Sequence, residues 1–379
     1  MGGSTVHGHR AAPEGDAMAP PRRKATLLAV AEHAGVSLKT ASNVVNGTGR
    51  MADETRQRVR AAVDELGYTV NVAARNLTRG RTDSVTLAVP TLKAAYLAEL
   101  AEVVVDTARR RDLVVYVTTY PDEGRTGSRR LLQQFNSQLT DGLLLSLSEH
   151  ETLDREALDV PYPLVCLGSR NTYGLTDRVT TDDVDDARTA TAHLLERGST
   201  SIAVVGAHVP FDATGIGAAR EGNAELRLRG VLEEVTAWGG ALDPRLVGVT
   251  GYDWTIGSGF RVARDLIETG PPFDGLVCLN DGLAIGAVSA LREGGLRLPE
   301  DVQVIGFDDV EESAYLNPPL TTMDSRIDWI AETALDKLIA RIDRAAGAPT
   351  TEFARSRVIE RATTRTVGKR FLRSEASAV

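Results

Sequence analysis

The stretch GVSLKTASNVVNG, residues 35–47, contains a glycine turn followed by a short helical pattern. Its apolar residues Ala41, Val44 and Val45 recur at helical spacing and predict one buried face, whereas Lys, Thr, Ser and Asn make up the other face. The preceding segment TLLAVAEHA (26–34) also predicts a helix, with a threonine at its N-cap position. Two helices joined by a short turn that contains glycine predict a helix-turn-helix unit.

A third amphipathic helix is predicted in DETRQRVRAAVDELG (53–67), which ends at a glycine. Its apolar face would pack on the other two helices, so the polar face of the second helix is left free to enter a DNA major groove. The charge distribution supports this interpretation, because residues 22–81 hold 11 Lys and Arg against 5 Asp and Glu while the whole chain has a net charge of −9. A basic module joined to an acidic body predicts a polyanionic partner.

Residues 71–84, NVAARNLTRGRTDS, predict a short helix that would be marginal by itself. We expect this helix to form when its arginines meet DNA. Leu77 lies in it without an apolar neighbourhood, and such a side chain can enter a base step from the minor groove as a wedge. The alternative is a flexible linker with an incidental leucine.

From Ser84 onward, apolar strand-like runs alternate with helical patterns. Strands of continuous apolar character separated by helices predict parallel sheets that are covered on both faces. The run is long enough for two such sheets, at roughly residues 83–182 and 183–325. A further helix is predicted at 326–346 and a last strand at 351–360, so the expected fold is an α/β core of two doubly wound parallel-sheet subdomains behind an all-α headpiece.

The composition excludes several classes of protein. The 379 residues are 42% apolar, as in globular proteins, and no run of about 18 apolar residues suggests a membrane span. Residues 1–24 lack the apolar middle of a secretory signal, so we expect a disordered leader and a cytoplasmic protein. The two cysteines, Cys166 and Cys278, lie in apolar runs and are expected to be buried free thiols.

The motifs of common enzyme sites are missing from the sequence. It contains no P-loop, no G-x-S-x-G, no H-E-x-x-H and no Cys/His metal spacing. The segment GIGAAR (215–220) starts like a dinucleotide fingerprint but has Arg220 in place of the third glycine. We therefore expect neither an enzyme nor a bound cofactor or metal.

Polar and aromatic side chains follow several of the predicted strands. Ligands of open parallel sheets bind beyond the carboxyl ends of the strands, and an aromatic face with guanidinium, amide and carboxylate groups suits a sugar. These residues are Tyr96, Arg170, Trp254, Asn280 and Asp308, together with Arg227 in a following helix. Each also has a structural alternative: Asn280 as a helix N-cap, Asp308 as a solvated loop acid and Trp254 as filling between layers.

The segments TLLAVAEHAGVSLKTASNVVNG, DETRQRVRAAVDELGY, NVAARNL, NDGLAIGAV and GFDDVEESAYLNPPLTTM resemble the lac-repressor (LacI/GalR) family of bacterial transcription regulators, collinearly over about residues 26–366. The resemblance implies a homodimer that binds a near-palindromic operator. It also implies a small effector, a sugar or nucleoside-type metabolite, bound between two periplasmic-binding-protein-like subdomains.

The resemblance also divides the chain. It implies a headpiece at 25–70, a hinge helix at 71–82, a core at 83–366 and a tail at 367–379. Three crossings near residues 182, 325 and 349 would place 83–182 and 326–349 in the first subdomain and 183–325 and 350–366 in the second. The tail contains no apolar heptads, so a dimer is expected rather than a coiled-coil tetramer.

Site residues carry over by position. The resemblance implies that Leu38, Lys39 and Asn43 read bases, and that Leu77 opens the central base step. Phosphate contacts and other DNA contacts are implied for Thr26, Ser37, Thr40, Ser42, Asn46, Arg50, Asn71 and Ala74. Effector contacts are implied for Arg227, Trp254, Asn280 and Asp308, and more loosely for Tyr96 and Ser325. Gly168 stands at a position where sugar-binding relatives can carry an acidic residue. We therefore expect the nearby Arg170 to have a different role from that of the equivalent residue in those relatives.

Two other functions compete with a repressor. One is a solute-binding protein whose first helices only pack, and the other is a Rossmann-type enzyme. The basic headpiece and the missing signal argue against the first, and the missing catalytic residues argue against the second. Within the regulator class, the effector can release DNA as an inducer or tighten DNA binding as a corepressor.

Overall fold

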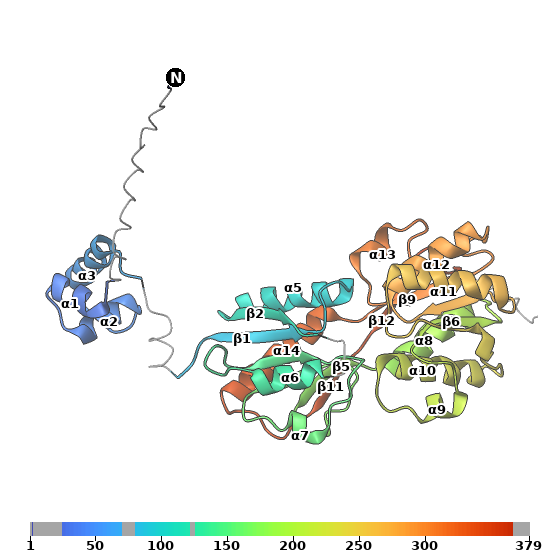
Figure 1. Cartoon of the computed structure of the whole chain (residues 1–379), viewed down its shortest axis with the longest axis horizontal. Helices are drawn as coiled ribbons and strands as arrows, with labels where there is room; N and C mark the ends of the chain where they lie inside the picture. The colour runs from blue at the N-terminus through green and yellow to red at the C-terminus, as the bar shows by residue number, and fades with distance from the viewer. Residues whose placement is uncertain (1, 3–24, 70–79, 122–125, 367–379) are drawn as a thin grey trace, which may run out of the picture. The chain divides into compact units, whose positions relative to one another are not determined.

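A computed structural model describes residues 2, 25–69, 80–121 and 126–366. The chain divides into two compact units, Met1–Gly80 and Arg81–Val379 (Figure 1). The expected leader, the tail after residue 366 and most of the expected hinge helix, with Asn71, Ala74 and Leu77, lie outside the described residues. Within the described part of the chain, no helix is long and apolar enough to cross a membrane.

The first unit is the predicted helix-turn-helix module. Thr26 caps the first helix by accepting a hydrogen bond from the Ala29 backbone N–H, and Gly35 ends it in the left-handed conformation with φ 62°. Val30, Ala41 and Val59, one from each helix, are fully buried against one another. The helices are α1 (Leu27–Ala34), α2 (Leu38–Val45) and α3 (Asp53–Leu66).

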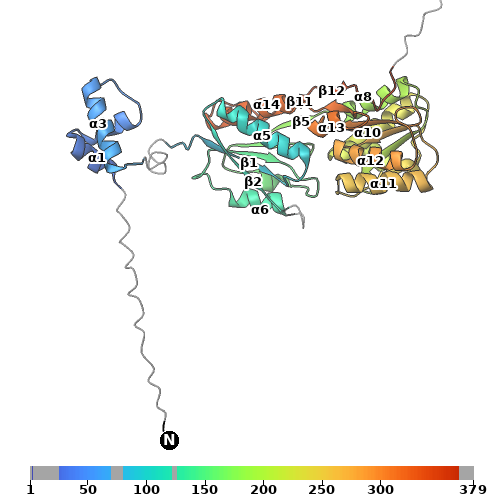
Figure 2. The same cartoon turned by 90° about the horizontal axis from the view of Figure 1, so that it is seen from above.

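The second unit contains two six-stranded sheets, each with helices on both faces (Figures 1 and 2). We call the first sheet with its helices the first lobe. Its strand order is β11-β5-β4-β3-β1-β2, and all its pairs are parallel. The strands are β1 (Ser84–Val89), β2 (Val114–Thr119), β3 (Leu143–Ser146), β4 (Leu164–Leu167), β5 (Asp177–Thr181) and β11 (Thr351–Ala354).

The helices of the first lobe bury its sheet on both sides. On one face, Leu100 and Leu335 pack on Leu87 and its neighbours, and on the other face Leu132 and Leu158 pack on the opposite side chains of the same strands. Because side chains alternate between the two faces of a strand, both sets of apolar residues are covered. The helices are α5 (Ala95–Arg109) and α14 (Ile327–Ile342) on the first face, and α6 (Gly127–Gln134) and α7 (Arg155–Leu158) on the second.

The second lobe has the strand order β12-β10-β9-β8-β6-β7, and β12 alone is antiparallel to its neighbour. Its strands are β6 (Ile202–Ala207), β7 (Val247–Val249), β8 (Gly275–Cys278), β9 (Gln303–Phe307), β10 (Thr321–Asp324) and β12 (Arg357–Ile359). Its helices are α8 (Asp183–Glu196), α9 (Ala213–Ala218), α10 (Asn223–Ala237), η1 (Pro244–Leu246), α11 (Ile256–Thr269), α12 (Asp281–Glu293) and α13 (Glu311–Tyr315). Cys166 and Cys278 are buried free thiols, as predicted.

The chain passes between the lobes three times. The first passage lies between β5 and α8, and the second lies between β10 and α14. The third differs from the expectation, because the segment predicted as one strand at 351–360 forms β11 in the first lobe and β12 in the second. The passage therefore lies at residues 355–356, after β11, and not near 349. Ser356 in the break donates a 2.6 Å hydrogen bond to Asp186 of α8, which fastens the third passage to the first.

Candidate functional site

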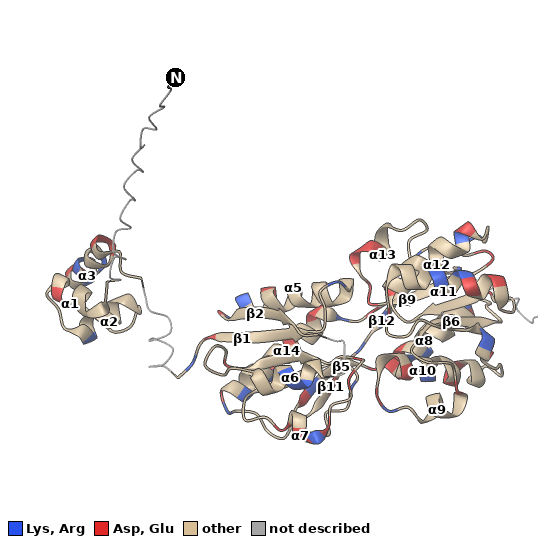
Figure 3. Cartoon of the chain, viewed as in Figure 1, with Lys and Arg blue, Asp and Glu red and all other residues tan. Residues whose placement is uncertain are grey.

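The first unit presents the side chains that the sequence predicts for DNA contact. Ser37, Lys39 and Arg50 are exposed, and Leu38 keeps 49% of its surface in contact with solvent. Lys39 is the only charged residue of α2 (Figure 3). Thr26 is exposed, and Thr40, Ser42, Asn43 and Asn46 are half-buried.

Local hydrogen bonds explain why α2 carries so many small polar residues. Ser37 caps the helix by accepting from the Thr40 backbone N–H at 3.1 Å, and the Asn46 amide donates to the Ser42 hydroxyl at 3.2 Å. These bonds fix the helix ends and the polar side chains along one face. Such a face has the donors and acceptors that phosphates and base edges require.

A cavity of about 230 Å³ lies between the lobes, at the carboxyl ends of the strands of both sheets. This is the position expected for a ligand of an open α/β sheet. Six of the seven predicted effector residues line it: Tyr96, Arg227, Trp254, Asn280, Asp308 and Ser325. Arg170 does not line it and instead contacts a lining residue, Glu149, with 3.3 Å between Nη2 and Oε2.

Among the residues that the structure describes, Arg227 is the only arginine that lines this cavity. Its Nε donates a 2.7 Å hydrogen bond to Asp183, at the first passage between the lobes, and its Nη1 donates to the Leu279 carbonyl. The guanidinium also lies 4.5 Å from the centre of the Phe307 ring. Both members of the Arg227–Asp183 pair are buried, so the arginine is held rigidly before any ligand binds.

Two predicted residues combine a structural role with a place in the cavity wall. Asn280 caps α12 by accepting from the Leu283 N–H at 2.8 Å, and its amide donates to the Trp254 carbonyl at 3.3 Å. The Trp254 indole N–H donates to the Gly206 carbonyl at 2.9 Å. Asn280 is therefore the N-cap of α12, as the structural alternative stated, and it also lines the cavity.

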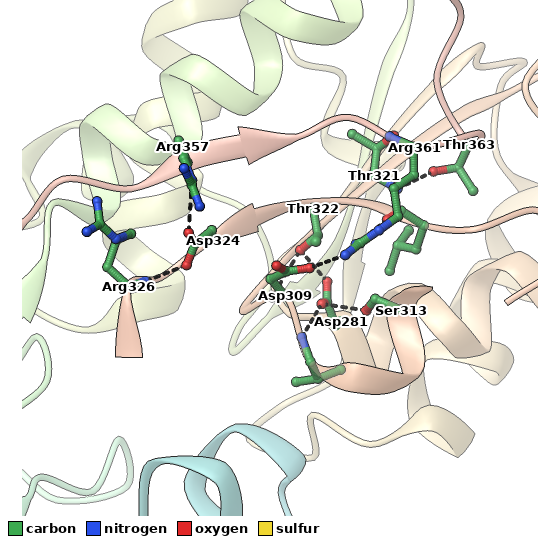
Figure 4. A network of polar contacts seen from close by, with 12 residues as sticks. Asp281, Asp309, Ser313, Thr321, Thr322, Asp324, Arg326, Arg357, Arg361 and Thr363 are labelled. Carbon is green, nitrogen blue, oxygen red and sulfur yellow. Dashed lines mark hydrogen bonds and ion pairs between the residues drawn. The ribbon is translucent and has the colours of Figure 1, made fainter. Parts of the chain in front are cut away.

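Asp308 occupies an unusual backbone conformation. Its φ is 110° and that of Asp309 is 56°, values that side-chain-bearing residues adopt rarely. Arg361 holds the turn by a 2.6 Å contact from its Nη2 to Asp309, and Asp281 accepts hydrogen bonds from Ser313 and Thr322, each at 2.7 Å (Figure 4).

Asp308, in this turn, lines the cavity. Burial raises the pKa of Asp308 well above its ordinary value, and the Arg227 charge opposes that shift. Burial also raises the pKa of Asp281 to about 7 against the opposing effect of its hydrogen bonds. Asp308 is half-buried at the cavity wall, where a carboxyl group can exchange hydrogen bonds with a ligand.

The sequence analysis missed most of the other side chains of the cavity wall, and four of them are polar or aromatic groups that follow strands. Glu149 and His150 follow β3, His208 follows β6, and Tyr252 follows β7. The rule that ligands bind beyond strand ends would have identified all four, because each comes shortly after an apolar run. Their contact with one another depends on residues that are about 50 to 100 positions apart, and no sequence pattern records it.

Comparison with known proteins supports the two-part organisation. Residues 26–71 match the family model described as bacterial regulatory proteins, lacI family, and residues 191–364 match a periplasmic binding protein-like domain. The HTH-type transcriptional regulator CelR of Thermobifida fusca is 33% identical over 333 residues, which cover 85% of this chain and 93% of CelR. The chain belongs to the LacI family.

Other members of the LacI family match over nearly the whole chain. The HTH-type transcriptional repressor PurR of Escherichia fergusonii is 30% identical over 89% of this chain and 96% of PurR. The structure of a CelR–cellobiose complex aligns with a TM-score of 0.64 at 27% identity, over 90% of this chain and 100% of that chain. This LacI-family protein is a DNA-binding transcriptional regulator with an effector-binding type of core, and its relatives are regulators rather than enzymes.

Proposed function

We propose that this LacI-family protein is a repressor that binds a palindromic operator as a homodimer and releases it when a sugar binds between its lobes. The observation that carries the effector part is the meeting of Arg227, Asn280, Asp308 and Trp254 in one cavity. Groups from three different strand ends and from helix α10 converge there, as ligand recognition requires.

The chemistry of the cavity favours a sugar. The second lobe supplies hydrogen-bonding groups through Arg227, Asn280 and Asp308, and the first lobe adds both polar side chains and apolar ones that include Leu147 and Leu167. A sugar ring has hydroxyl groups around its edge and an apolar face, so it matches both walls. The CelR–cellobiose complex provides a precedent in a relative. A nucleoside-type effector is the alternative.

The exposed edge of the first sheet supports a dimer. In β2, Val114 and Tyr116 keep 55% and 57% of their surfaces exposed, and Val117 is also exposed. An apolar edge strand invites pairing or aggregation unless another surface covers it. Two copies of this chain would cover it and would bring two headpieces to the half-sites of one operator.

The proposed switch is a shift between two arrangements of the lobes. Effector binding favours the closed cleft, and the closed cleft moves the headpieces out of the spacing that the operator needs. Binding of operator and effector then oppose each other by the same coupling free energy, whichever ligand binds first. The name of the PurR relative, a repressor, supports repression, while a corepressor would use the same parts with the opposite sign.

Fluorescence anisotropy of the full chain on DNA from its own upstream region tests the function. We expect tight binding that weakens steeply with salt, because several phosphates are contacted, and release by one sugar in a panel of sugars and nucleosides. A compound that tightens binding of the protein to this DNA would be a corepressor. Absence of DNA binding under every condition by a folded dimer would contradict the regulator and favour a solute-binding protein.

A further inference from the structure

We propose that His150 and Tyr252 form an aromatic gate across the cleft that limits the effector to a single sugar ring. This inference rests on the proposed sugar-binding function and specifies the class of sugar. The gate joins the two lobes, because His150 belongs to the first and Tyr252 to the second.

The gate is part of a continuous row of rings. The centroids of His150 and Tyr252 are 4.1 Å apart, those of Tyr252 and His208 are 4.2 Å apart, and Trp254 follows His208 at 5.6 Å. His208 is buried, and its Nδ1 lies 3.1 Å from Glu225, which fixes the orientation of its ring. Tyr252 is thus held between an anchored ring of its own lobe and a ring of the opposite lobe.

Hydrogen bonds from backbone N–H groups near the rings also join the two lobes on the same side of the cleft. The Asn223 backbone N–H donates to Glu149 at 3.1 Å, and the Asn171 N–H donates to Glu221 at 2.9 Å. The Gly222 N–H donates to the Ser169 carbonyl at 3.2 Å. All three bonds join the first lobe to residues 221–223, at the start of α10. They hold the two lobes together on the side of the cleft where the rings meet.

The ring spacing excludes a second sugar unit between His150 and Tyr252. A ring placed between two aromatic faces needs two van der Waals separations of roughly 3.5–4.0 Å each. The centroids are 4.1 Å apart, so the faces already contact each other. The space behind the gate, about 230 Å³, also falls below the roughly 300–1,000 Å³ of pockets for larger ligands.

The two walls behind the gate also fit one ring. The first lobe lines the cavity with apolar side chains, which include Leu97, Leu167 and Val179, beside polar ones such as Glu149, and the second lobe adds further polar groups. A single ring can place its apolar face on the first wall and its hydroxyl groups against Arg227 and Asp308. A second unit would have to displace Tyr252 and break the wall that closes the cleft.

Isothermal titration of the full chain with matched sugars tests the gate. The probes are glucose with cellobiose, galactose with lactose, and xylose with xylobiose. The proteins are the wild type, Tyr252→Ala and His150→Ala, with Trp238→Ala as the control. Trp238 is an exposed aromatic residue at the end of α10 that does not line the cavity, so its removal tests for effects of aromatic truncation alone.

We expect the wild type and Trp238→Ala to bind one monosaccharide at least about tenfold more tightly than its disaccharide. Tyr252→Ala and His150→Ala should each bind the disaccharide more tightly than the wild type does, so that the ratio of monosaccharide to disaccharide affinity falls. A variant that only unfolds would lose affinity for both sugars. Equal binding of both sugars by the wild type, or an unchanged ratio in both gate variants, would overturn the gate while leaving the sugar-responsive regulator intact. Absence of binding by every sugar would reject the sugar class and the gate with it.

Discussion

Glu149 of the first lobe accepts a 3.1 Å hydrogen bond from the backbone N–H of Asn223, the first residue of α10 in the second lobe. The carboxyl group is also paired with Arg170 at 3.3 Å. Burial nevertheless dominates, and it raises the pKa of Glu149 to about 7. A carboxyl group that changes its solvation when the cleft opens couples closure to proton binding.

The first prediction concerns the pH dependence of effector binding. Opening the cleft exposes Glu149 and returns its pKa toward the ordinary value of 4.5, so the closed form binds the proton more tightly. The stabilisation of the closed form is therefore complete below about pH 4.5 and is lost as the pH rises through about 7. Effector affinity measured by titration calorimetry should fall between pH 5.5 and 7.5 and then level off.

Glu149→Gln should flatten this profile, because the amide keeps a carbonyl acceptor and carries no charge. Glu221→Gln is the matched control, since Glu221 accepts a backbone hydrogen bond on the same wall from Asn171. A profile that is equally steep in wild type and Glu149→Gln would assign the pH dependence to another group.

The second prediction concerns the Arg227–Asp183 pair. Removing one member of a buried pair leaves an uncompensated charge, so Arg227→Met should lower the free energy of unfolding of the core by about 3–5 kcal/mol. Adding Asp183→Asn should restore much of that loss, because it removes the orphaned carboxylate. Denaturant titrations of the two variants measure both effects. Equal stability of Arg227→Met and the wild type would show that the pair contributes nothing.

The third prediction concerns the turn that carries Asp308. Asp309→Asn weakens the 2.6 Å contact with Arg361 and loosens a backbone held at positive φ. Because the cavity loses only the positioning of Asp308, we expect effector affinity to fall by about tenfold, near the lower end of the roughly 1.5–3 kcal/mol of a hydrogen bond to a charged group.

Operator affinity of Asp309→Asn in the absence of effector should not change. Glu360→Gln serves as its control. Glu360 directly precedes Arg361 in the sequence, and its substitution breaks a comparable 2.7 Å ion pair with Arg197. If both variants bind the effector like the wild type, Arg361 does not position Asp308.

The fourth prediction concerns base recognition. Asn43 is half-exposed on α2, and its loss should relax the preference for one base pair in each half-site by roughly 1–3 kcal/mol. Affinities of Asn43→Ala for operators altered at each position measure this discrimination. Arg60→Ala, exposed on α3 and outside the predicted contacts, is the control. An unaltered preference profile for Asn43→Ala would mean that Asn43 reads no base.

Local sequence patterns determined much of this protein. The helix-turn-helix depends on apolar spacing and on caps such as Thr26 and Gly35, and all of these act within a few residues. The alternation of strands and helices and the residues after each strand are equally local. That is why Trp254, Asn280 and Asp308 could be placed beyond the strand ends from the sequence, whereas the effector role expected for Arg227, inside α10, came from the family resemblance.

Tertiary structure alone decided the contacts between distant segments. The sheet change at residues 355–356 is invisible locally, because a strand pattern does not state which sheet the strand joins. The contact of His150 with Tyr252 and the bond from Asn223 to Glu149 depend on how two lobes close. The raised pKa of Glu149 arises from that burial, which the identities of neighbouring residues in the chain do not encode.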